Sequence, residues 1–147
     1  MKDVYSEALK IVLARRRTQK EVSDLLIKKG YEADEAHEAA QHYAEQGYID
    51  DADYARRYAH DAARIKGYGE HRIRMALREK GVDCRYIDDA IADTEFNIKE
   101  VIIKKFGQPH KVTYEQMNKM CAAIIRRGFS PGEVTRTVKE IYEIEES

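Results

Sequence analysis

Apolar residues recur at three- and four-residue spacing along most of the chain, a pattern typical of helices that bury one face. Three such runs end in the same way, with an aliphatic residue, two variable residues, a cation, a glycine and another apolar residue. The three phrases are LIKKGY at 26–31, LREKGV at 77–82 and IIRRGF at 124–129. A cation near a helix C-terminus interacts favourably with the helix dipole, and a following glycine readily adopts the left-handed conformation that ends many helices. We therefore expect Gly30, Gly81 and Gly128 to follow the ends of three helices, with positive φ.

The spacing of these glycines indicates internal repeats. They lie 51 and 47 residues apart, so the repeat length is about 50 residues. Aligning the chain on the glycines brings together three sets of apolar residues with the i, i+3, i+4 spacing of one helix face. The sets are Val22, Ile73 and Met120; Leu25, Ala76 and Ala123; and Leu26, Leu77 and Ile124.

Each repeat is predicted to contain three helices. The expected ranges are 3–16, 18–29 and 33–46, then 51–65, 70–80 and 84–93, then 95–106, 114–127 and 131–144. Capping boxes begin three of these helices, formed by Thr18 with Glu21, Thr113 with Gln116 and Ser130 with Glu133, and Pro131 occupies the favoured first helical position. No segment alternates with period two, so no sheet is expected. The predicted fold class is all-α, with three tandem three-helix repeats (1–49, 50–93 and 94–147) forming an elongated, curved array.

Charge alternates along the repeats. The chain has 147 residues, of which 36% are charged, and its net charge of −1 excludes a uniformly basic coat for nucleic acid. Residues 1–30, 64–85 and 101–128 carry net charges of +4, +4 and +5, whereas the segments between and after them carry −7, −4 and −3. Two interpretations remain open: a solvated, salt-bridged surface, or repeats with a basic and an acidic side.

Catalytic and metal-binding patterns are absent from the sequence. The five histidines lack zinc spacing, there is no Walker loop or GxSxG motif, and Cys84 and Cys121 have no CxxC partner. The two cysteines are expected to be small buried residues in a reducing, cytoplasmic environment. Helix capping explains Asp50, Asp51 and Asp53 better than a divalent cation does. We expect no enzymatic activity, cofactor, metal, signal peptide or membrane span.

The middle repeat carries unusual arginines. On the helix expected at 70–80, Arg74 and Arg78 lie opposite the core face and Arg72 lies on its flank. The positions equivalent to Arg74 and Arg78 are Ser23 and Ile27 in the first repeat and Cys121 and Ile125 in the third. The scaffold therefore does not require arginine there. The arginines form either a solubility face or a contact surface for a phosphate backbone or an acidic protein.

Other candidate binding residues occur in short clusters. Tyr68 lies between two glycines beside Lys66 and Arg72, where an exposed ring could stack on a base or enter a partner's pocket. Tyr54 and Tyr58, four residues apart, favour core packing. The remaining basic candidates are Arg15, Arg16, Arg17 and Lys20 between the first two helices, Arg64, and Lys104 and Lys105, with Lys111 nearby.

Residues 47–82, GYIDDADYARRYAHDAARIKGYGEHRIRMALREKGV, resemble the central signature of the RecX family of recombination regulators. Matching positions include Gly47, Tyr48, Ile49, Asp50 and Asp51, then Arg64, Lys66, Gly67, Gly69, Arg72 and Ile73, and finally Leu77, Lys80 and Gly81. The first and third repeats also resemble the start and end of the family pattern. Tyr54, Ala76 and Val22 depart from it, at positions outside the basic signature.

The resemblance implies three tandem three-helix repeats and a modulator, mainly an inhibitor, of the RecA recombinase. Such a protein binds the RecA filament on single-stranded DNA and limits its growth, its ATP hydrolysis, strand exchange and LexA cleavage. The expected partner is that filament, with weak direct DNA binding, for a monomeric protein. Two alternatives remain: a sequence-independent DNA-binding module that competes with RecA, and a helical-repeat scaffold for another protein.

Overall fold

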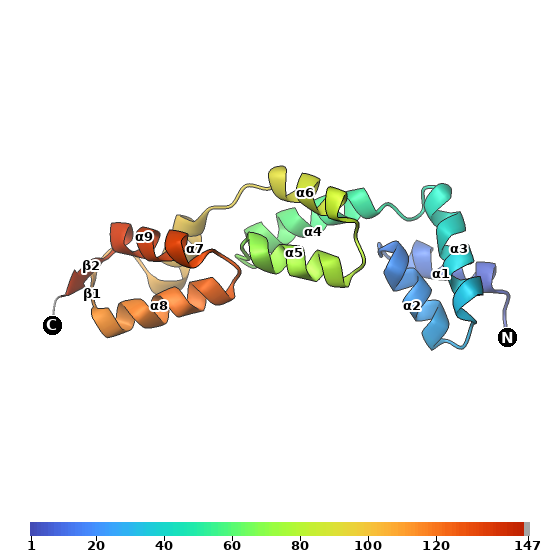
Figure 1. Ribbon diagram of the computed structural model, residues 1–147, viewed down its shortest axis with the longest axis horizontal. Coiled ribbons are helices and arrows are strands. Elements are labelled where there is room, and N and C mark those ends of the chain that lie inside the picture. Colours follow the sequence, from blue (N-terminus) through green and yellow to red (C-terminus); the bar gives the residue numbers. More distant parts are fainter. Residues whose placement is uncertain (146–147) are drawn as a thin grey trace. The chain divides into compact units, whose positions relative to one another are not determined.

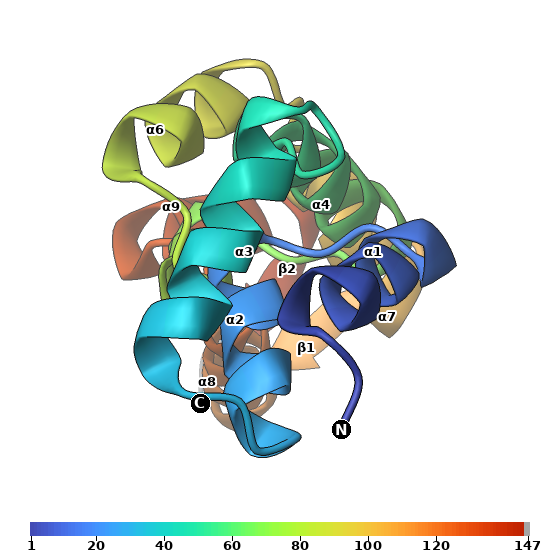
Figure 2. The same cartoon turned by 90° about the vertical axis from the view of Figure 1, so that its right-hand side faces the viewer.

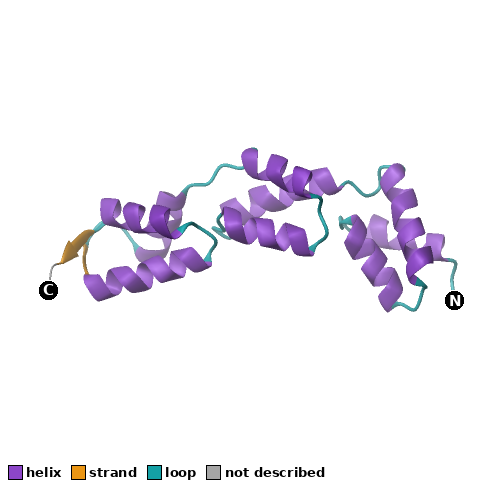
Figure 3. Ribbon diagram, viewed as in Figure 1, coloured by secondary structure: helices purple, strands orange, loops and turns teal. Residues whose placement is uncertain are grey.

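The computed structural model describes residues 1–145, which form nine helices and two short strands (Figures 1 and 3). The first three helices are α1 (Val4–Ala14), α2 (Gln19–Lys28) and α3 (Ala33–Glu45). They are followed by α4 (Asp51–Ile65), α5 (Glu70–Glu79) and α6 (Cys84–Ala92). The last three are α7 (Ile98–Phe106), α8 (Tyr114–Arg126) and α9 (Pro131–Ile141), with β1 (Lys111–Thr113) before α8 and β2 (Glu143–Glu145) after α9. The predicted all-α class with three-helix repeats is confirmed.

The three repeat glycines end the middle helix of each repeat, as the sequence predicted. Gly30, Gly81 and Gly128 follow α2, α5 and α8 with φ of 109°, 80° and 106°. After α2, the amide of Gly30 donates to the carbonyl of Ile27 and that of Tyr31 to Leu26. The same pair of hydrogen bonds follows α5, which identifies both turns as Schellman motifs.

The first repeat is a packed three-helix unit, in which α1, α2 and α3 contact one another (Figure 2). Val22 and Leu26 of α2 are fully buried, and the small side chains of Ala36, Ala39 and Ala40 let α3 approach closely. One charged group is also buried: Glu7 of α1 pairs with Lys29 at 2.6 Å. The hydrogen bond from Lys29 lowers the pKa of the Glu7 carboxyl, so the ion pair persists at neutral pH.

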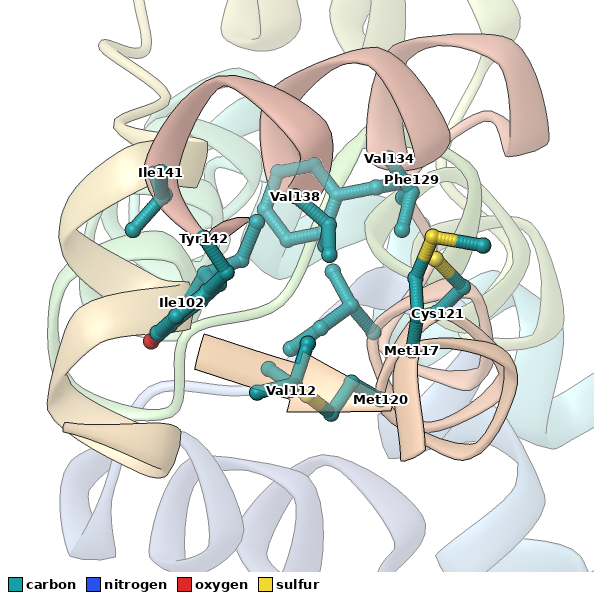
Figure 4. Packing of buried hydrophobic residues seen from close by; sticks show 11 residues of the cluster. Ile102, Val112, Met117, Met120, Cys121, Phe129, Val134, Val138, Ile141 and Tyr142 are labelled. Carbon is teal, nitrogen blue, oxygen red and sulfur yellow. The ribbon is translucent and has the colours of Figure 1, made fainter. Parts of the chain in front are cut away.

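The third repeat has its own core (Figure 4). Ile102 of α7, Ile124 of α8 and Val138 of α9 are completely buried and meet in this core. Tyr142 extends the core beyond α9, and its hydroxyl donates to the carbonyl of Gly107 at 2.6 Å. That hydrogen bond ties the end of α9 to the end of α7.

The expectation of no sheet is wrong. β1 and β2 form a parallel two-stranded sheet in which Val112 pairs with Ile144. Each strand has three residues, and only Val112 is buried. So short a strand cannot show a period-two pattern, because one buried residue is not an alternation. The predicted helix 131–144 also runs too far, because α9 ends at Ile141 and β2 begins at Glu143.

Several local predictions can be compared with the structure. The capping boxes at Thr18 and Thr113 are confirmed, as is Pro131 at the start of α9, whereas Ser130 makes no side-chain cap. Cys121 is buried as predicted, but Cys84 is exposed at the start of α6. Asp50 accepts a hydrogen bond from the amide of Asp53, in keeping with helix capping. No helix within residues 1–145 is long and apolar enough to cross a membrane.

The chain forms two compact units. One contains residues 1–58 and 76–93, and the other contains residues 59–75 and the chain from Thr94 onward. Residues of the middle repeat thus occur in both units, and each unit holds one contact between neighbouring repeats. The repeat boundaries at 49/50 and 93/94 stay a prediction.

Candidate partner-binding surface at the repeat junctions

Two equivalent junctions join the repeats, one inside each compact unit. In the first junction, the N-terminus of α2 meets the C-terminus of α5, where the Thr18 hydroxyl donates to the Lys80 carbonyl at 2.6 Å. In the second junction, the N-terminus of α5 meets the C-terminus of α8, where the Gly69 amide donates to the Arg127 carbonyl at 2.8 Å. Thr18 and Gly69 each lie twelve residues before the glycine that ends their own helix. The two contacts are therefore equivalent in the repeat register, although the donor is a side-chain hydroxyl in the first and a backbone amide in the second.

Close backbone approach explains the glycines of the second junction. A Cβ atom on Gly69 would lie 2.6 Å from the carbonyl carbon of Gly128. A Cβ on Gly128 would lie 2.6 Å from both the backbone nitrogen and the Cβ of Arg72. Real Cβ atoms do not approach this closely, so neither position can carry a side chain without movement of the junction.

We expect Thr18→Ala to lower the free energy of unfolding by about 2–3 kcal/mol, which urea denaturation followed by circular dichroism measures. Thr18 is fully buried, caps α2 and also donates to Lys80. Thr113→Ala is the matched control, because Thr113 forms the same capping box on α8 but is exposed. Its expected cost is about 1 kcal/mol. Equal losses for the two variants would contradict a stabilising role for the first junction.

Charges in the first junction are largely compensated. Lys80 pairs with Glu21 at 3.4 Å, Lys20 with Asp24 at 3.1 Å, and Arg16 lies 4.0 Å from Asp53. Partial burial opposes the charge on Lys80, but the negative charge of Glu21 and the Tyr54 hydroxyl outweigh it, so the pKa of Lys80 is raised. Lys80 also lies 5.9 and 5.8 Å from the centroids of the stacked Tyr54 and Tyr58 rings, which are half-buried. These cations have partners within the protein.

Arg15 and Arg17, the other members of the predicted first basic cluster, differ in environment. Arg15 is exposed at the end of α1. Arg17 is half-buried and donates to the carbonyl of Ile11 at 3.3 Å, which holds the α1–α2 loop against α1. Arg15 is therefore the more accessible of the two.

The second junction gathers cations around Tyr68. The guanidinium carbon of Arg72 lies 4.0 Å from the centre of the Tyr68 ring, and the Lys66 ammonium lies 5.6 Å from it. Arg127 donates to the carbonyl of Lys66 at 3.0 Å, and Arg72 to the carbonyl of Arg126 at 3.4 Å. We call these five residues the Tyr68 cluster. Tyr68 itself is half-buried rather than exposed, because Arg72 covers its ring.

The cations of the Tyr68 cluster lack acidic partners. Within residues 1–145, none of Lys66, Arg72, Arg126 and Arg127 forms an ion pair, and neither does the exposed Arg64 at the end of α4. By contrast, Arg16, Arg56 and Arg57 all lie within 4.0 Å of the single carboxylate of Asp53. The Tyr68 cluster is thus a local excess of positive charge, suited to an anionic partner.

Sequence reasoning did not single out Arg126 and Arg127 as binding residues. They were visible only as part of the repeated phrase RRGF, in which a cation before the glycine was explained by the helix dipole. Their contact with Lys66 and Arg72 spans 61 and 54 residues. No pattern within a few residues predicts a contact over such a sequence distance. The one available signal was the pair of cations before Gly128 in the repeated phrase.

The other arginines of α5 differ in environment. Arg74 is partly buried, with its side chain 29% exposed, and it pairs with Glu70 at 3.1 Å. The prediction that Arg74 lies opposite the core face is wrong, because its register equivalents Ser23 and Cys121 are both buried. Arg78 is exposed. Lys104 and Lys105 are exposed in the last turn of α7, and Lys105 lies 5.7 Å from the ring of Phe106.

Solved structures share this fold. A crystal structure of a regulatory protein RecX matches with a TM-score of 0.77 and 24% identity, over 93% of this chain and 70% of that one. The crystal structure of RecX from Lactobacillus salivarius matches with a TM-score of 0.72 and 21% identity, over 93% and 92% of the two chains. At these identities the likeness concerns the fold.

Sequence comparison identifies the family. Residues 50–91 match the family model described as the second three-helix domain of RecX. Regulatory protein RecX of Pectobacterium atrosepticum is 35% identical over 69% of this chain, which spans 65% of that relative's length. The RecX protein of Clostridium botulinum strain Eklund 17B is 30% identical over 94% of this chain and 68% of its own, and that of Xanthomonas oryzae strain MAFF 311018 is 30% identical over 86% and 81%. With its three repeat glycines and matching signature, the chain belongs to the RecX family of regulatory proteins.

Proposed function

We propose that this protein is a non-enzymatic regulator that binds the RecA filament on single-stranded DNA and limits its growth. It acts in the cytoplasm, as a monomer and without a cofactor. By occupying the filament it lowers RecA ATP hydrolysis, strand exchange and LexA cleavage. The support for this proposal is family membership together with a surface that fits an anionic partner.

The observation that carries the proposal is the uncompensated charge of the Tyr68 cluster. The side chains of Lys66, Arg72 and Arg127 meet there, and Arg126 joins them through its backbone carbonyl. None of these four cations has an acidic partner within the described chain. Surface cations usually remain mobile, whereas Arg72 and Arg127 are held by backbone carbonyls and by an aromatic ring. Ordered, unpaired arginines are suited to a partner rich in phosphate or carboxylate groups.

We expect the protein to bind RecA-coated single-stranded DNA at least tenfold more tightly than the same bare strand, with a shallower salt dependence. The net charge of −1 gives little long-range attraction to bare DNA, so only local cations neutralise phosphates. A coated strand also offers protein surface, and contacts made by several repeats reinforce one another through effective concentration. The measurement is fluorescence anisotropy of labelled protein and of labelled oligonucleotide, with and without RecA and a slowly hydrolysed ATP analogue. Equal affinities would instead support the DNA-binding module that competes with RecA.

The decisive test of the proposed function is RecA ATPase activity on single-stranded DNA, titrated with this protein. We expect inhibition at protein concentrations well below those that saturate bare DNA. Unchanged ATPase at saturating protein, together with no retention of RecA in a pull-down, would reject the proposal and support a scaffold for another protein.

A further inference from the structure

Two guanidinium groups of the Tyr68 cluster, those of Arg72 and Arg127, are held in place but largely unused as donors. A guanidinium carries five N–H donors. Arg72 uses Nη1 toward the carbonyl of Arg126, and Arg127 uses Nη1 toward the carbonyl of Lys66. Neither guanidinium makes another hydrogen bond within residues 1–145. Most of their donors therefore remain available to a ligand.

Close packing holds these arginines before any ligand binds. A Cβ on Gly128 would lie 2.6 Å from the Cβ of Arg72, and one on Gly67 would lie 2.7 Å from Nη1 of Arg127. Each arginine thus lies directly against a glycine of the junction. Side chains that are ordered in advance lose less conformational entropy on binding.

Comparison with the first junction shows that the scaffold does not need this charge. The residues equivalent to Arg72 and Arg126 are Glu21 and Glu79. Glu21 neutralises Lys80, which is the equivalent of Arg127. A middle-helix end therefore docks on the previous middle helix with Glu21 and Glu79 at one junction and with Arg72 and Arg126 at the other. Docking by itself does not require arginines at these positions, although Arg72 and Arg127 add hydrogen bonds across the second junction.

We propose that the second junction is a binding site for the phosphodiester backbone of single-stranded DNA. Arg72 and Arg127 donate to phosphate oxygens, and Lys66 and Arg126 add positive charge. A strand carries a phosphate on every nucleotide, so one strand can satisfy several of these cations together, whereas an acidic protein would have to match them with carboxylates one by one. The inference rests on the proposed function and names the part of the filament that this junction contacts.

Tyr68 is a positioning residue for Arg72 in this site, not a platform for a base. The guanidinium of Arg72 covers the ring at 4.0 Å, and the Lys66 ammonium lies 5.6 Å from the ring centre. The backbone amide of Tyr68 donates to the carbonyl of Ala62, which fixes the turn that carries the ring. A base could stack on the covered face only by displacing Arg72.

The test uses anisotropy with two fluorescein-labelled probes of equal length, an oligo(dT) strand and an abasic phosphodiester strand, over a series of salt concentrations. The variant is Arg72→Gln/Arg127→Gln. We expect at least tenfold weaker binding to both probes and a salt slope reduced by about 1.4, as two lost phosphate contacts on a single strand require. The matched control is Arg56→Gln/Arg57→Gln, which removes the same charge from arginines that pair with Asp53. The control should bind within twofold of the wild type.

Because Arg127 also holds the carbonyl of Lys66, the double variant is checked by circular dichroism and melting temperature. Arg72→Gln/Arg126→Gln keeps that hydrogen bond and provides the second test if the first variant does not fold. A folded variant that binds the abasic strand as tightly as the wild type, with an unchanged salt slope, overturns the phosphate site.

Tyr68 variants separate positioning from stacking. Tyr68→Phe keeps the ring that supports Arg72 and should bind normally. Tyr68→Leu keeps all four charges, and we expect three- to tenfold weaker binding to both strands alike. A loss confined to the base-bearing strand would overturn the positioning role and assign Tyr68 to stacking.

RecA ATPase inhibition, measured on the same wild-type protein, distinguishes failure of this site from failure of the proposed function. If the arginine variants lose DNA binding but the wild type does not inhibit RecA, the phosphate site is supported and the proposed filament regulator is rejected. Normal inhibition by a wild type whose DNA binding does not depend on these arginines rejects the phosphate site alone.

Discussion

Gly128→Ala is expected to lower the free energy of unfolding by about 3–5 kcal/mol, the largest stability effect we predict. Two costs add at this position. Gly128 has a φ of 106°, which side chains rarely adopt, and its new Cβ would lie 2.6 Å from the backbone nitrogen of Arg72. Backbone atoms cannot rotate away as a flexible side chain can, so the second junction must open. Urea denaturation measures the loss.

Gly30→Ala is the matched control for this prediction. Gly30 is the register equivalent of Gly128 and has nearly the same φ, 109°. Its Cβ would meet only the Met1 side chain, at an ordinary distance of 3.7 Å. We expect a loss of about 1–2 kcal/mol from backbone strain alone. Similar losses for the two variants would show that the second junction adds nothing to the conformational requirement for glycine.

Arg64→Glu/Lys66→Glu/Arg126→Glu is expected to raise the protein concentration needed for half-inhibition of RecA ATPase at least tenfold. The three side chains are exposed and form no ion pair within residues 1–145, so each change should cost under about 0.5 kcal/mol of stability. Their reversal turns the most positive surface at the second junction negative. The sequence alone indicates Arg72, Arg74 and Arg78 as the candidate contact surface. Arg72 and Arg74 are poorly suited to this test, because they contact Tyr68 and Glu70.

The control Lys119→Glu/Arg136→Glu/Lys139→Glu makes the same change in net charge on exposed positions of α8 and α9. It tests whether total charge, rather than the Tyr68 cluster, determines binding. We expect it to inhibit RecA within twofold of the wild type. Full inhibition by the cluster variant, or equal loss in both variants, would assign the cluster to solubility.

The helical repeat could be predicted from the sequence because its signals are local. A glycine after a cation, a capping box and an i, i+3, i+4 apolar set each lie within a few residues of the helix end that they specify. The predicted core face is confirmed for Val22, Ile73 and Met120, which are all buried. Ala76 and Ala123, predicted on the same face, are only half-buried. β1 and β2 could not be predicted, because a three-residue strand with at most one buried side chain shows no period-two alternation.

The candidate surface was predicted only in part. Lys66, Tyr68 and Arg72 are adjacent in sequence, and the structure brings them together. Arg126 and Arg127 join them across more than fifty residues. Alignment of the repeats identifies equivalent residues. It does not show that the end of one middle helix docks on the start of the previous middle helix. At the second junction that contact depends on close backbone approach at Gly69 and Gly128, which is a property of the three-dimensional structure.

The small sheet of the third repeat sets the start of α8 apart from the starts of α2 and α5. At both junctions, the N-terminal end of a middle helix, α2 or α5, receives the glycine turn of the next repeat. The corresponding end of α8 is preceded directly by β1, which pairs with β2 and contacts α8. The position of α8 equivalent to Thr18 and Gly69 is Gln116, which is exposed. The sheet therefore ties the chain that follows α9 to the strand before α8, and it leaves the equivalent docking position of α8 exposed.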